Sequence, residues 1–88
     1  MSDYKNYDLY TKVVEITGDY LGPASRRFID RQIINHLGKE PEEITDADLK
    51  ELIKWIEAAT ALLTEDKSLI REFRQRLEVL SNNRQTAS

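Results

Sequence analysis

The stretch Ile44-Thr45-Asp46-Ala47-Asp48-Leu49 carries a complete signal for the start of a helix. The Thr45 hydroxyl can accept a hydrogen bond from a backbone N–H of the first turn, and the Asp48 carboxylate can accept one from the N–H of Thr45. Ile44 precedes this cap and can pack against Leu49 as a hydrophobic staple. The stretch predicts a helix, and apolar residues at helical spacing extend it over 46–63, with Leu63 expected on the core side.

The rest of the chain also has helical periodicity. Apolar residues at helical spacing predict three further helices, over about 7–20, 23–37 and 66–80. No alternating pattern typical of strands persists beyond a few residues. We therefore expect an all-α protein, a compact four-helix domain spanning 1–80, followed by a polar, disordered tail at 81–88.

Glycine and proline mark two of the predicted connections. Gly22-Pro23 separates the first two helices, because glycine suits the residue that ends a helix and proline suits the first turn of the next. Gly38 ends the second helix, and Pro41 follows in a polar linker. The Gly22-Pro23 joint is short, so the first two helices should meet at a sharp angle.

Size and composition restrict the class of protein. The chain has 88 residues, of which 40% are hydrophobic and 33% are charged, as expected of one globular domain. It has no cysteine, which excludes disulfides and thiolate metal sites. No apolar run approaches the roughly 18 residues that cross a bilayer, and no secretory leader is visible. A cytoplasmic protein that does not enter a membrane is expected.

The net charge of −3 is unevenly distributed. Residues 39–63 carry seven acidic and three basic side chains, a local charge of −4, whereas the flanking regions are close to neutral. Binding to nucleic acid needs clustered Lys and Arg. Arg26, Arg27 and Arg31 could supply some, but the following helix is acidic where a recognition helix should be basic. Nucleic acid is therefore disfavoured as a partner.

A candidate anion site lies at the start of the second predicted helix. Pro23-Ala24-Ser25-Arg26-Arg27 places unpaired backbone N–H groups beside two guanidinium groups, which together could hold a phosphate or carboxylate. The segment lacks the Gly-x-x-x-x-Gly-Lys pattern of a phosphate-binding loop. The alternative is an ordinary helix start with solvated arginines.

Other chemical motifs are missing. His36 is the single histidine, near the apolar face of its predicted helix and without a second donor at metal-binding spacing. Asp46 and Asp48 lack the central glycine of a calcium loop and already have a capping role. No nucleophile lies in a recognisable catalytic motif. We expect no enzymatic activity, no metal and no cofactor.

Some apolar residues lie away from the predicted core faces. Trp55, Ala58 and Leu62 lie beside the main apolar face of the helix at 46–63, and Ile34 lies among charged residues of the helix at 23–37. Exposed Trp and large aliphatic residues are common at protein contacts. They are candidates for a contact with a partner or with a second copy of the chain. Burial of these helices on two sides would be the alternative explanation.

The run Tyr20-Leu21-Gly22-Pro23-Ala24-Ser25-Arg26-Arg27-Phe28-Ile29-Asp30-Arg31, followed by His36-Leu37-Gly38-Lys39-Glu40-Pro41, resembles small helical modules with a Leu-Gly-Pro joint. Such modules accompany bacterial signalling and regulatory proteins, particularly in cyanobacteria. The similar part covers roughly 20–66. The resemblance implies a regulatory or interaction role and transfers no catalytic residue.

Two functions thus remain open from the residues. The first is a non-catalytic protein-interaction or regulatory module, self-association included, which uses Ile34, Trp55, Ala58 and Leu62. The second is a sensor of a small anion or phosphate ligand that uses Arg26 and Arg27.

Overall fold

The computed structural model describes residues 3–87 of the chain and the side chains of residues 8–82. The α-helices are α1 (Asp3–Leu21), α2 (Ser25–Leu37), α3 (Asp46–Leu63) and α4 (Lys67–Ala87). The short 3-10 helices η1 (Gly22–Ala24) and η2 (Pro41–Glu43) lie in the first two connections. No strand occurs in the described part of the chain, which confirms the prediction of an all-α protein.

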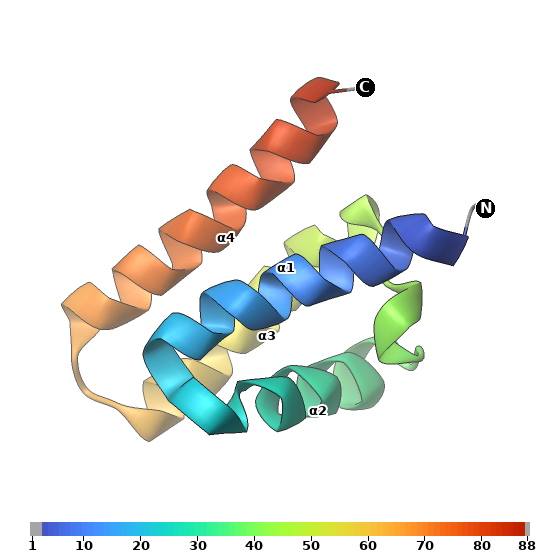
Figure 1. Cartoon of the computed structure of the whole chain (residues 1–88). Coiled ribbons are helices and arrows are strands. Elements are labelled where there is room, and N and C mark those ends of the chain that lie inside the picture. Colours follow the sequence, from blue (N-terminus) through green and yellow to red (C-terminus); the bar gives the residue numbers. More distant parts are fainter. Residues whose placement is uncertain (1–2, 88) are drawn as a thin grey trace.

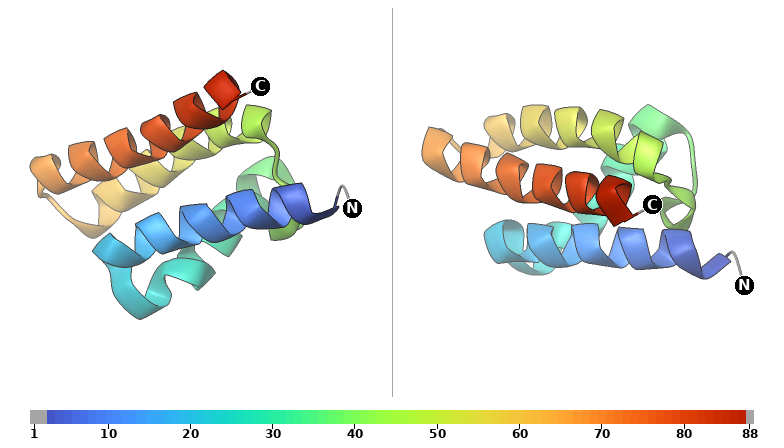
Figure 2. Two further views of the ribbon diagram at one scale, coloured as in Figure 1. Left: turned by 45° about the horizontal axis from the view of Figure 1, so that its top comes forward. Right: turned by 90° about the horizontal axis from the view of Figure 1, so that it is seen from above.

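Each helix packs against the next one in the chain, and α4 returns to pack against α1. Figure 1 shows α3 and α4 as an antiparallel pair, with α1 beside them and α2 running obliquely beneath. The view from above in Figure 2 shows α1, α3 and α4 side by side. This bundle leaves the outer faces of α2 and α3 next to each other on one side of the molecule.

The two glycine joints adopt the geometry that their sequence predicts. Gly22 and Gly38 have φ angles of 63° and 65°, in the left-handed region that glycine enters without a steric penalty. The N–H of Gly38 donates to the carbonyl oxygen of Ile33 at 3.1 Å and closes the end of α2. These joints turn the chain sharply between helices, so that α1 packs against α2 and α2 against α3.

The predicted cap of α3 is confirmed. The backbone N–H of Asp48 donates to the Thr45 hydroxyl at 3.1 Å, and the N–H of Thr45 donates to the Asp48 carboxylate at 3.0 Å. Lys39 from the preceding linker forms an ion pair with the same carboxylate. Ile44 and Leu49, the predicted staple residues, are both fully buried. The sequence around residue 45 therefore determines where α3 begins.

The Asp48 carboxyl titrates below its usual range. Burial acts to raise its pKa, but hydrogen bonds from Lys39 and from Thr45 outweigh burial and lower the pKa below its ordinary value. A lowered pKa in the folded state contributes stability above about pH 4. That contribution is lost as the pH falls through the lowered pKa.

Removal of the cap hydroxyl should destabilise the protein measurably. We expect Thr45→Ala to lower the free energy of unfolding by about 1 kcal/mol, because the N–H of Asp48 loses its acceptor. Urea denaturation followed by circular dichroism measures the change. Thr45→Ser keeps the hydroxyl and should retain most of the stability. Equal stability of the alanine and serine variants would contradict the capping role.

The core contains apolar residues from every α-helix. The Tyr20 ring of α1 stacks on the Phe73 ring of α4, with centroids 4.8 Å apart and planes inclined by 23°. Such contacts between α1 and α4 close the bundle. The buried apolar residues are Leu9, Tyr10, Val13, Ile29, Ile33, Ile44, Leu49, Leu52, Ile53, Ile56, Phe73 and Leu77.

Some predicted helix boundaries differ from those observed. α1 begins at Asp3 rather than near residue 7, because no Gly or Pro interrupts these residues and an acidic first residue suits the helix dipole. α2 begins at Ser25, because Pro23 lies in η1 instead of the first α-helical turn. The helix predicted over 46–63 has the bounds that the structure shows.

The end of the last helix also differs from the prediction. α4 continues to Ala87, past residue 80, where the sequence predicts that this helix ends. Neither Gly nor Pro stops the helix near Leu80, and Ser81 is buried against the bundle. The two outer limits of the predicted domain and tail, Met1 and Ser88, lie outside the described residues.

Candidate functional site

A groove lies on the surface between the start of α2 and the end of α3. It has a volume of about 360 Å³ and is mostly apolar. We name it the Leu62 groove after the most exposed of its large hydrophobic residues. Its lining residues are Ala24, Arg27, Phe28, Arg31, Gln32, Ala59, Leu62 and Leu63.

Two leucines at the end of α3 leave the Leu62 groove incompletely covered. Leu62 is 88% exposed and Leu63 is 62% exposed. Leu63 was expected in the core, but it lies on the last turn of α3, where the bundle no longer covers it. Phe28 and Ala59 are half-buried beside them. Contiguous apolar side chains left in water mark interaction sites on many proteins, whereas single exposed apolar residues are ordinary.

Two arginines form the charged rim of the Leu62 groove. Arg27 and Arg31 lie one helical turn apart on α2, and both are exposed. Within the described residues, no hydrogen bond or ion pair joins either guanidinium to another side chain. Like charges at this spacing destabilise a helix by about 0.2–0.5 kcal/mol. The pair does not stabilise the fold, which leaves both groups available to a ligand.

Trp55 is engaged in a contact within the chain. Its ring stacks on the His36 ring of α2, with centroids 3.8 Å apart and planes within 1° of parallel. Its indole N–H donates to the Glu51 carboxylate at 3.3 Å, and the residue is 37% exposed. His36 was expected near the apolar face but is exposed on the seam between α2 and α3. The stack joins these two helices near the surface.

The predicted contact residues do not form one surface. Leu62 lines the groove, whereas Ile34, Trp55 and Ala58 are exposed outside it. Ile34 belongs to the outer face of α2, and Ala58 to the outer face of α3. The structure thus places one of these candidates, Leu62, in the mostly apolar groove.

Sequence reasoning missed Phe28, Arg31 and Leu63 as members of this site. The adjacent pair Leu62-Leu63 offers a signal, because neighbours on a helix point about 100° apart and cannot both face one core. Arg31 offers another, since it repeats the charge of Arg27 at the i+4 position. Phe28 has the spacing of a core residue and gives no signal of its own.

The predicted anion site has a different arrangement. Arg26 donates to the Tyr10 hydroxyl at 3.0 Å, and that hydroxyl donates to the Asp30 carboxylate at 2.6 Å. The first N–H of α2, on Ser25, already donates to the carbonyl oxygen of Gly22. The hollow beside Pro23 and Ala24 is lined by Asp30 as well as by Arg26 and Arg27.

This network joins α1 to α2 and changes the titration of its central group. Burial, followed by the hydrogen bond to Asp30 and its negative charge, raises the pKa of Tyr10 to about 12. The Arg26 guanidinium opposes this rise. The negative charge of Asp30 also opposes the approach of an anion. The geometry thus favours a structural role for Arg26.

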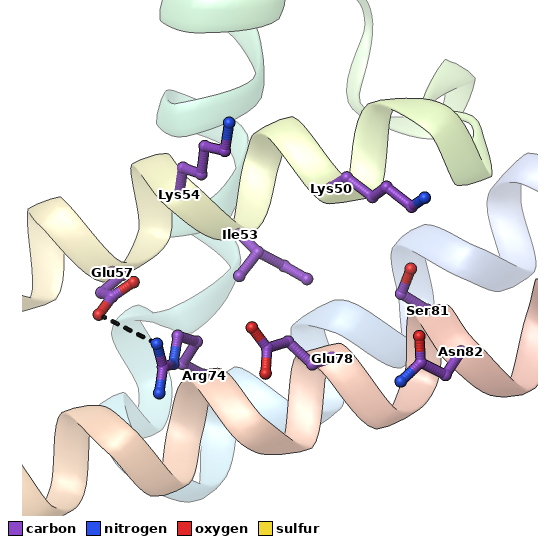
Figure 3. A pocket seen from close by; sticks show the side chains of 8 residues that line it. All are labelled: Lys50, Ile53, Lys54, Glu57, Arg74, Glu78, Ser81 and Asn82. Atoms are coloured by element: carbon purple, nitrogen blue, oxygen red, sulfur yellow. Dashed lines mark ion pairs between the residues drawn. The ribbon is translucent and has the colours of Figure 1, made fainter.

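A second groove of about 410 Å³ separates α3 from α4. Figure 3 shows Glu57 facing Arg74 across it, with an ion pair of 3.9 Å between the Glu57 Oε2 and an Arg74 terminal nitrogen. Glu78 lies beside Arg74, and Lys50 and Lys54 point in different directions. The opposite charges of Glu57 and Arg74 attract α4 to α3. The charged side chains that line this groove do not converge on one point. This groove fits a helix–helix seam better than an ion-binding site.

Among the described residues, no three His, Asp or Glu side chains gather in a manner that could hold a metal ion. None of the described helices combines the length and apolar character needed to cross a membrane. Comparison of the chain with protein-family models, with curated proteins and with solved structures found no match.

Proposed function

We propose that this chain is a non-catalytic interaction module, a compact four-helix domain that docks another protein on the Leu62 groove. The observation that carries the proposal is the exposure of Leu62 and Leu63 beside two arginines without partners in the described chain. The resemblance of residues 20–66 to bacterial regulatory modules supports a regulatory setting in the cytoplasm.

The energetics favour a reversible contact. Complete burial of an exposed leucine side chain contributes about 1.5–3 kcal/mol. Association costs several kcal/mol in lost translational and rotational freedom. Leu62 and Leu63, with the half-buried Phe28, therefore support weak to moderate affinity. A contact of this strength suits a partner that exchanges during regulation.

Site-specific crosslinking tests this proposal. A photo-crosslinking amino acid at position 62, in the full chain within its native host, should capture a protein in a discrete adduct. Position 79 is a matched control, because Val79 is also an exposed aliphatic residue, 54% exposed, but lies on α4 away from the groove. We expect adducts from position 62 and none from position 79.

Two results would contradict the proposal. Equal adducts from both positions would indicate random collision, and the absence of adducts at position 62 would remove the assigned contact surface. The mass of the adduct also separates a different protein from a second copy of this chain.

A further inference from the structure

We infer that the segment docked on the Leu62 groove is an amphipathic helix whose apolar residues are flanked by Asp or Glu. This inference rests on the proposed function and names the chemistry of the partner. Three observations support it: the shape of the groove, the charge of its rim, and the composition of the chain's own acidic segment.

The shape of the groove favours a helix. A volume of about 360 Å³ accommodates a few side chains, as the anchors of one docked helix require. A peptide that binds as an added β-strand needs a sheet edge, and the described chain has no strand. A polyproline segment needs a groove lined by several aromatic rings, and Phe28 is the single aromatic residue among those that line this groove. A helix satisfies its own backbone and presents apolar anchors at i and i+4.

The positive charge on the rim of the groove favours Asp or Glu beside the apolar residues of the docked helix. Arg27 and Arg31 lie one turn apart and are not paired with any described side chain. A guanidinium group binds a carboxylate through two parallel hydrogen bonds. Carboxylates one turn apart on the docked helix would match this spacing. Lysines at those positions would be repelled.

A second copy of this chain fits poorly. Its densest acidic segment contains Glu40, Glu42 and Glu43, and η2 is a single short turn. The apolar residues next to these carboxylates, Pro41 and Ile44, are buried in their own molecule and cannot serve as anchors.

Two synthetic peptides test the inference on the full chain. The first is an acetylated, amidated helix of about 18 residues, with leucines repeated one turn apart and Glu on both sides of the leucine stripe. The second has Lys in place of every Glu. We expect the acidic peptide to bind about tenfold more tightly. Amide shifts in NMR spectra should concentrate at Ala59, Leu62 and Leu63, and added salt should reduce the preference.

Charge reversal supplies the decisive control. The double variant Arg27→Glu with Arg31→Glu should favour the Lys peptide, because the rim changes sign. Lys67→Glu with Arg71→Glu alters the net charge equally on exposed positions of α4, outside the groove lining, and should keep the preference for the acidic peptide. Circular dichroism confirms that the variants remain helical.

Each alternative result separates the inference from the proposed function. Equal binding of both peptides at Leu62 would overturn the acidic preference but leave the groove as a docking surface. Failure of both peptides at millimolar concentration to shift the NMR signals of the groove residues would overturn the inference that the ligand is a helix. Crosslinking at position 62 would still test the proposed function separately. A dimer in sedimentation that Leu62→Glu dissociates would show that a second copy occupies the groove.

Discussion

Phe73→Ala is expected to lower the free energy of unfolding by about 3–5 kcal/mol. Phe73 is fully buried on α4 and stacks on Tyr20 of α1, so its removal leaves a cavity where these helices meet. A domain of this size has a total stability on the order of 4–13 kcal/mol. The substitution therefore removes a large fraction of the stability and shifts part of the population to the unfolded state.

Chemical denaturation of the wild-type and variant chains measures this effect. Val79→Ala is the control on the same helix, because Val79 is exposed and its truncation should change stability by no more than about 0.5 kcal/mol. A Phe73→Ala variant as stable as the Val79→Ala variant would show that α4 does not pack as the structure describes.

The second large effect is a loss of stability at alkaline pH through Tyr10. Its pKa in the folded protein is about 12, against about 10 in an unfolded chain. Because the folded pKa is the higher one, Tyr10 contributes stability below about pH 10, and the contribution is lost as the pH rises toward 12. This difference of two pKa units between the folded and unfolded states corresponds to about 2–3 kcal/mol of folding stability.

Comparison with Tyr10→Phe isolates this contribution from other groups that titrate in alkali. Below pH 10 the variant should be less stable, because the Asp30 carboxylate and Arg26 lose their shared hydroxyl. Between about pH 9 and pH 11.5, the stability difference between wild type and variant should shrink by about 2 kcal/mol. Urea denaturation of the wild type and the variant at both pH values measures this stability difference.

The matching control is Tyr20→Phe. The Tyr20 hydroxyl bonds Glu72 and Arg76 at the exposed surface rather than within the interface between α1 and α2. This variant should retain the alkaline loss that the wild type shows. If Tyr10→Phe and the wild type lose stability in parallel as the pH rises, the network does not titrate as described.

Local sequence signals predicted the start of α3 and both glycine joints. Thr45 and Asp48 bond each other within one turn, so no distant residue is needed to specify that cap. Gly22 and Gly38 adopt positive φ angles for steric reasons that belong to the residue itself. The helical class follows from the periodicity of apolar residues, which is also local information.

The candidate site depended on information that the sequence does not contain. Arg26 and Arg27 are neighbours with the same charge, yet Arg26 bonds Tyr10, whereas Arg27 lies on the rim of the Leu62 groove. Trp55 and Leu62 share a side of α3, yet Trp55 stacks on His36. Their roles differ because residues from other helices reach one member of each pair and not the other.

The sequence alone determined that this protein is helical, where its glycine joints bend, and where α3 is capped, because each depends on interactions within a few residues. The tertiary structure decided which apolar residues stay exposed. Leu63 has the periodicity of a core residue, but the helices that surround α3 do not extend over its last turn. Burial depends on the placement of distant segments, and helical spacing within one segment does not encode that placement.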